Sequence, residues 1–189
     1  MNDWCPFAIQ RSLPLDHSDV RPQPPSEIVL HITEGTTPGG AFATFLASLS
    51  PHRVSAHFIV VRDGSIWQLV PLSRVAWHAS QVNYHSIGIE HVALSAAGAA
   101  DLNHRHPSGA PFVYMPATEE QYAASAKLLA WLCGQTGISM DRAHIRTHHE
   151  ASPIDHHDLC CTGALDPDRV VTMAAALKSA GSLHDGIPT

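Results

Sequence analysis

The sequence has little of what marks several classes of protein. It contains no run of about 18 apolar residues, so we expect no transmembrane helix. Lys and Arg number 11 against 17 Asp and Glu, and a pI near 6.2 argues against the basic surface that nucleic-acid binding needs. Charged residues make up only 15% of the chain, whereas 44% are hydrophobic. Such a chain can bury a sizeable core, and disorder is not expected as its main state.

Cysteine and export signals are also scarce. The four cysteines, Cys5, Cys133, Cys160 and Cys161, do not make a disulfide framework in a chain of 189 residues. Free thiols suit a reducing compartment. The chain begins without a basic segment followed by an apolar stretch, so we expect no secretory signal and a cytoplasmic location.

Histidine, in contrast, is abundant. It occupies 15 of the 189 positions, against roughly 2% in an ordinary soluble domain. Five histidines fall between residues 144 and 157, where carboxylates and thiols also gather: His144, His148, His149, His156, His157, Glu150, Asp155, Asp158, Cys160 and Cys161. Imidazole, carboxylate and thiolate are the ligands that Zn²⁺ takes. A solvated histidine-rich loop that binds metal only adventitiously would fit this composition as well.

Hydrophobic periodicity predicts alternating strands and helices. Strands are expected at 28–33, 55–61, 65–70, 86–94 and 144–147, and Asp63-Gly64 predicts a hairpin between the second and third. Helices are expected at 41–48, from a capping box at Thr118 to about 133, and from Asp166 onward. We therefore predict an α/β fold with a mixed central β-sheet flanked by helices.

The length favours one domain. We expect a proline-rich N-terminal arm at residues 1–26, the domain itself at 27–180 and a C-terminal tail at 181–189.

Two polar residues lie in otherwise apolar strand segments. His31 follows Leu30 just before a Gly-rich loop, a place where sites are built; a core histidine with a structural partner is the alternative. Glu90 follows Ile87-Gly88-Ile89, and burial would raise its pKa toward the range useful for general acid–base chemistry. A surface pair on an edge strand is the alternative for Glu90.

Several motifs occur in an order that resembles a known family. They are His31, Ser55-Ala56-His57-Phe58-Ile59 before Arg62-Asp63-Gly64, Ala76-Trp77-His78-Ala79, Ser86-Ile87-Gly88-Ile89-Glu90, Gln121, and His148 four residues before Pro153. Together they resemble the type-2 N-acetylmuramoyl-L-alanine amidases. That family includes wall-recycling anhydro-muropeptide amidases, peptidoglycan recognition proteins and phage lysozyme-amidases. The resemblance covers residues 27–180, which makes this segment an expected amidase domain.

The resemblance implies a zinc hydrolase that cleaves the amide between N-acetylmuramic acid and L-alanine. The family's first zinc ligand falls on His31 and its second on His148, with His149 as the neighbouring alternative. The third falls on Asp158. Cys160 and Cys161 stay open as third ligands, because the Pro-Gly that normally follows this ligand is absent here.

Four other residues are candidates for the site, and the resemblance implies roles for the first three. Glu90 would be the general base, and His156 stands where the family has a catalytic lysine that donates to the oxyanion. His78 falls at a position that lines the substrate groove, and a structural histidine beside a buried Trp77 is the alternative. From its alternation within a strand, His57 would form the floor of the site or point into the sheet. We expect surface or loop positions for the remaining candidates: His52, His85, His91, His104, His106 and His184.

The implied partners are peptidoglycan fragments or muropeptides, with no nucleic acid and no membrane insertion. A cytoplasmic enzyme, or one delivered to the cell wall by a route other than general secretion, would fit. A non-catalytic peptidoglycan-binding module of the same fold is the alternative function. A metal buffer, which would bind several ions weakly, is a third.

Overall fold

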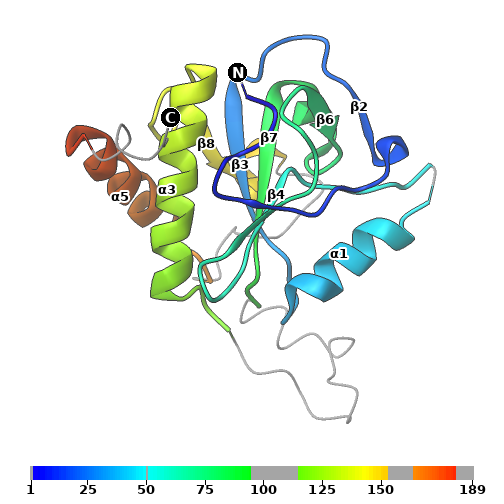
Figure 1. The fold of residues 1–189 in the computed structure, drawn as a ribbon, viewed down its shortest axis with the longest axis horizontal. Helices are drawn as coiled ribbons and strands as arrows, with labels where there is room; N and C mark the ends of the chain where they lie inside the picture. Colours follow the sequence, from blue (N-terminus) through cyan, green and yellow to red (C-terminus); the bar gives the residue numbers. More distant parts are fainter. Residues whose placement is uncertain (1, 50, 95–114, 153–163, 182–189) are drawn as a thin grey trace.

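A six-stranded mixed sheet forms the centre of the computed structural model, which describes residues 2–49, 51–94, 115–152 and 164–181 (Figure 1). The strand order is β1-β5-β4-β7-β3-β8. The strands are β1 (Ile9–Gln10), β3 (Glu27–Ile32), β4 (Phe58–Val60), β5 (Ile66–Gln68), β7 (Ser86–His91) and β8 (Ile145–Thr147). The expected mixed α/β sheet is confirmed.

Strand β3 lies inside the sheet between two parallel neighbours. It pairs in parallel with β7 on one side and with β8 on the other. All six of its residues are buried, as expected for a parallel strand covered on both faces. The predicted hairpin is also present, because β4 and β5 pair antiparallel around Asp63-Gly64. Gly64 adopts a positive φ of 83° there, which glycine supplies without steric strain.

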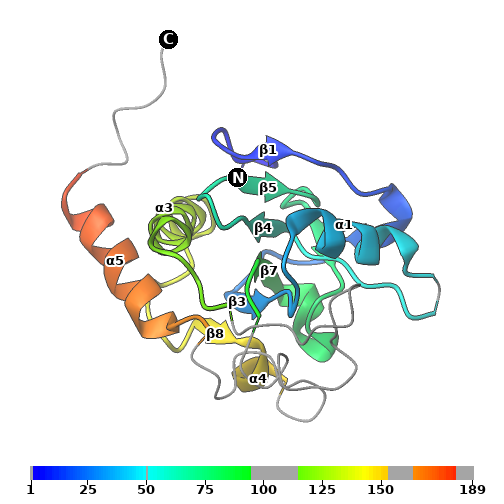
Figure 2. The ribbon, with the colours of Figure 1, turned by 90° about the horizontal axis from the view of Figure 1, so that it is seen from below.

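Helices cover both faces of the sheet. Helix α3 (Glu119–Thr136) and helix α5 (Pro167–Ser179) lie on one face and α1 (Pro38–Ala47) lies on the other, as Figure 2 shows. We call these the α3 face and the α1 face. Ile28, Leu30 and Ile32 of β3 pack on the α3 face. Ile59 and Phe45 belong to a smaller apolar cluster on the α1 face.

The start of α3 follows the predicted capping box. The Gln121 N–H donates to Thr118 Oγ1 at 3.2 Å, and the Thr118 N–H donates to Gln121 Oε1 at 3.0 Å. Its end was predicted too early, since the helix runs through Gly134 and stops at Gly137, which has a φ of 77°. A left-handed glycine at this position is a common helix terminator.

Residues before β3 pack onto the sheet. Strand β1 pairs in parallel with β5, and β2 (Ser18–Val20) pairs antiparallel with β6 (Arg74–Ala76). The 3-10 helix η1 (Leu15–His17) precedes β2, and a second 3-10 helix, η2 (Ser80–His85), connects β6 to β7. Within the described ranges, no helix combines the length and apolarity needed to cross a bilayer.

Candidate functional site

His31 and Glu90 are direct neighbours across the central strand pair. They are in register between the parallel strands β3 and β7, so their side chains leave the sheet on the same face. Ile59 of β4 is in register with Glu90 and packs near α1, which identifies this as the α1 face. His31 is 2% exposed and Glu90 is partly exposed. The buried imidazole of His31 and the partly exposed side chain of Glu90 therefore belong to one site.

His148 reaches this site from a different element. Strand β8 ends at Thr147, and a one-turn helix, α4 (His148–Ala151), begins directly after it. The His148 ring is 4% exposed, and its centroid lies 4.3 Å from that of His31. Between the two candidates for the second ligand, the ring that contacts His31 is that of His148, whereas His149 is partly exposed.

A second capping box holds α4 in place. Thr147 Oγ1 accepts from the Glu150 N–H at 3.2 Å, and Glu150 Oε2 accepts from the Thr147 N–H at 2.7 Å. Arg142 Nη2 also donates to both Glu150 carboxylate oxygens. Although burial alone would raise the pKa of Glu150, these hydrogen bonds from Thr147 and Arg142 lower it. The Thr147-x-x-Glu150 spacing is the local signal that assigns Glu150 to a helix start and not to metal binding.

His78 fits tightly between His31 and β7. Its Nδ1 lies 3.0 Å from His31 Nε2, and its Nε2 lies 3.1 Å from Ser86 Oγ. The ring occupies the space that a side chain at Gly88 would need, since a Cβ there would lie 2.4 Å from His78 Cγ. Burial, followed by the neighbouring histidines and Arg21, holds the pKa of His78 well below its ordinary value. The ring is therefore neutral near pH 7.

His57 lies behind His78 and is fully buried. Its Nδ1 accepts from the Gly88 N–H at 3.0 Å, so its Nε2 carries the proton and donates to the Arg74 carbonyl at 3.1 Å. Arg21 Nη2 lies 3.0 Å from the same Nε2. Burial and then the Arg21 charge lower the pKa of His57 to about 3. The structure thus places His57 behind the site, and substrate contact by this residue stays a prediction.

His91 was expected at the surface, and that expectation is wrong. Its side chain is fully buried on the α3 face. Nδ1 donates to the His31 carbonyl at 2.9 Å, and Nε2 accepts from Ser125 Oγ at 2.9 Å. Burial is the main cause that lowers its pKa to about 4. The alternation of Ile87, Ile89 and His91 along one strand was the signal that could have placed it inside.

Not every predicted residue falls within the structure's described ranges. His156, Asp158, Cys160 and Cys161 lie outside them. Among the residues that the structure does describe, no group of three or more His, Cys, Asp or Glu side chains is arranged to hold a metal ion. The described part of the site therefore contributes two closely spaced imidazoles, from His31 and His148, and the carboxylate of Glu90.

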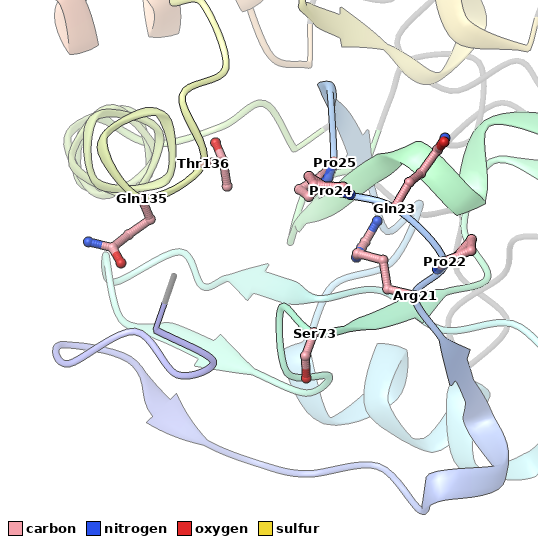
Figure 3. A pocket seen from close by; sticks show the side chains of 8 residues that line it. All are labelled: Arg21, Pro22, Gln23, Pro24, Pro25, Ser73, Gln135 and Thr136. Atoms are coloured by element: carbon pink, nitrogen blue, oxygen red, sulfur yellow. The ribbon is translucent and has the colours of Figure 1, made fainter.

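A separate pocket lies at the opposite end of β3, where the strand begins. It has a volume of about 420 Å³ and is lined by Arg21, Pro24, Pro25, Ser73, Gln135 and Thr136, among others (Figure 3). The Arg21 guanidinium donates to the carbonyls of Leu72, Tyr84 and Ser86. Arg21 is the only charged residue among those that line this pocket, and these hydrogen bonds engage its guanidinium. We therefore take the His31 end of β3 as the candidate site.

One protein-family model matches most of the chain. Residues 21–168 match the model of the N-acetylmuramoyl-L-alanine amidase family. The chain belongs to this family. The match includes His31, Glu90 and His148, together with the strands and the short helix that position them.

Curated relatives cover part of the chain. A 1,6-anhydro-N-acetylmuramyl-L-alanine amidase from Salmonella typhimurium is 36% identical over 107 residues, which are 42% of this chain and 56% of that protein. The corresponding amidase of Escherichia coli K12 is 33% identical over 105 residues, with shares of 42% and 57%. The chain thus spans a little over half the length of these relatives.

Solved structures show the same fold over a longer stretch. A selenomethionine derivative of the amidase AmpD has a TM-score of 0.67 at 24% identity, and the match covers 92% of this chain and 97% of that one. The Escherichia coli amidase AmiD, in complex with an anhydro-N-acetylmuramic acid peptide, has a TM-score of 0.53 at 22% identity, covering 70% and 51%. These similarities establish the α/β amidase fold.

Proposed function

We propose that this family member is a zinc-dependent hydrolase of the amide bond between N-acetylmuramic acid and L-alanine. The observation that carries the proposal is the contact between the His31 and His148 rings, with Glu90 in register beside His31. Family membership and the names of the relatives support the choice of bond. The presence of the Glu90 carboxylate beside His31 favours a catalyst over a wall-binding module, because hydrolysis needs a general base.

The donor set fits a zinc ion. Two buried imidazoles from separate elements are typical of a catalytic zinc site, which takes three protein ligands and leaves one position open. We propose His31 and His148 as two of these ligands and Asp158 as the third. When bound, the ion would supply Lewis-acid activation of water and of the scissile carbonyl.

Glu90 is the residue we propose as general base. Its carboxylate would accept a proton from the attacking water and then pass it to the departing L-alanine nitrogen. Glu90 is partly exposed, with its Oε2 atom buried, whereas His31 is almost fully buried. We further propose that protonated His156 donates to the oxyanion of the tetrahedral intermediate.

The proposed substrates are peptidoglycan fragments or muropeptides. The names of the Salmonella and Escherichia coli relatives specify the 1,6-anhydro form of the sugar, and the AmiD complex contains an anhydro-muropeptide. By analogy we propose anhydro-muropeptides first. We propose that the enzyme acts in the cytoplasm or, alternatively, is delivered to the wall by a route other than general secretion.

The decisive experiment incubates the purified protein with a defined anhydro-muramoyl peptide, with and without a chelator, and identifies the products by mass. We expect release of the intact peptide with a free L-alanine amine. Chelation, His31→Ala or His148→Ala should abolish release and lower the zinc content from about one ion per chain. The proposal fails if the muramoyl–alanine bond survives in the zinc-loaded wild-type protein.

A further inference from the structure

The short contact between His31 and His78 restricts the protonation of both rings. The 3.0 Å between His31 Nε2 and His78 Nδ1 is a hydrogen-bond distance, so one of these nitrogens carries the proton that they share. If His78 donates, the lone pair of His31 is occupied at Nε2 and its Nδ1 is protonated. If His31 donates, its Nε2 carries the proton and the lone pair is left at Nδ1.

Only the second arrangement gives His31 a lone pair that a metal ion can use. We propose that His78 is a positioning residue, which accepts from His31 Nε2–H and so keeps the His31 lone pair at Nδ1. This inference rests on the proposed zinc site. Metal-binding histidines generally donate their second ring N–H to a carboxylate, a carbonyl or water, which fixes tautomer and ring orientation. Here another imidazole is the acceptor.

Ser86 completes the arrangement on the far side of His78. When Nδ1 of His78 accepts, the ring proton lies on Nε2, and Ser86 Oγ is 3.1 Å from that atom, in position to accept it. Ser86 is buried at the start of β7, and its carbonyl is held by Arg21. The three side chains therefore form one directed series of hydrogen bonds, from His31 through His78 to Ser86.

The backbone around His78 keeps the ring in this orientation. Asn83 Oδ1 accepts from the N–H groups of both His78 and Ala79, at 2.9 and 2.7 Å. The ring presses against Gly88, where the absence of a Cβ is what admits it. Asn83 therefore fixes the backbone at His78, and Gly88 of β7 fixes the position of the ring. A positioning residue requires such rigidity.

Asparagine and alanine at position 78 separate the hydrogen bond from packing. The Oδ1 of an asparagine takes the place of His78 Nδ1 and can accept from His31, whereas alanine removes the acceptor. We expect zinc affinity, measured against a chromophoric chelator, to fall about 10- to 100-fold in His78→Ala. In His78→Asn it should stay within a few-fold of wild type. Equal losses in both variants, or no loss in His78→Ala, would overturn the proposal.

Histidine tautomers can be observed directly by ¹⁵N NMR of the metal-free protein at pH 7.5. We expect His31 in wild type and in His78→Asn to carry its proton on Nε2, and to lose this preference in His78→Ala. A wild-type His31 protonated at Nδ1 contradicts the proposal even if the alanine variant fails to fold. Wild-type protein that binds no zinc would instead refute the proposed function, so the two failures are distinguishable.

Discussion

The two faces of the central sheet differ in what their strands present. On the α3 face, Ile28, Leu30 and Ile32 of β3 are buried in the main apolar core. On the α1 face, the same strand presents His31, and β7 presents Glu90 beside it. Because successive side chains of a strand alternate between faces, a shift of register by one residue would exchange core and site. Burial of the apolar face therefore fixes the strand register that brings the proposed site residues His31 and Glu90 side by side.

The largest effect should come from the carboxylate on the α1 face. Replacing Glu90 by Gln removes the proposed general base while keeping the size of the side chain. We expect the rate of muropeptide hydrolysis to fall by about 10²- to 10⁴-fold, with zinc content and unfolding free energy close to wild type. A variant that keeps full activity would remove Glu90 from the mechanism, and the measurement is a rate at saturating substrate.

A substitution on the α3 face should lower the unfolding free energy and leave zinc binding and turnover nearly unchanged. Leu30 is fully buried under α3, and Leu30→Ala should lower the unfolding free energy by about 2 to 5 kcal/mol through the cavity it leaves. The protein that remains folded should bind zinc and turn over substrate nearly as wild type does. Denaturant unfolding gives the first quantity. A loss of specific activity larger than the loss of folded protein would show that the faces are coupled.

Acid should destabilise both faces together. The pKa of His57 is lowered to about 3 and that of His91 to about 4, while both titrate near 6.5 in the unfolded chain. Between these values the unfolded state binds more protons, so stability is complete above about pH 6.5 and falls as the pH falls.

Each of these histidines should contribute up to about 1.4 kcal/mol per pH unit. His78, whose pKa is also held well below its ordinary value by burial, contributes in the same direction. In the metal-free protein, we expect the unfolding free energy to fall by about 3 to 4 kcal/mol between pH 6 and pH 5. His91→Asn should reduce this pH dependence by roughly a third. An unchanged slope in that variant would mean that His91 is protonated in the folded protein.

The smallest effects should distinguish two equivalent helix caps. Thr147 caps α4, which carries His148, and Thr118 caps α3 on the other face. Each Thr→Ala substitution should lower the unfolding free energy by about 1 kcal/mol. Only Thr147→Ala should also weaken zinc binding, by several-fold, because it loosens the first turn that holds His148. Similar zinc affinities in the two variants would contradict this difference.

Local signals allowed much of the fold to be predicted from sequence. Asp63-Gly64 marked the hairpin, Thr118 and Gln121 marked the start of α3, and the apolar run around His31 marked β3. Each is decided by residues close together in the chain. The resemblance to a family then indicated that His31, Glu90 and His148 belong together.

The surroundings of these residues could not be predicted in the same way. His78 contacts His31 across 47 positions of sequence, and no local pattern specifies such a pairing. Its groove position stays a prediction, but both of its ring nitrogens face protein groups. His91 is different, because its alternation with Ile87 and Ile89 was a local signal for burial that the surface prediction overlooked. Glu150 looked like a potential ligand, whereas Arg142 and the Thr147 cap hold it.

Arg21 has a consequence for how short the protein can be made. This arm residue donates to the carbonyls of Leu72, Tyr84 and Ser86 and lies 3.0 Å from His57. A version trimmed to begin at residue 27 would keep every proposed ligand and the proposed base. It would nevertheless remove the guanidinium that donates to these three carbonyls. It would also remove the side chain that contacts His57 Nε2. When this protein is shortened or fused to another, the chain should therefore begin before Arg21.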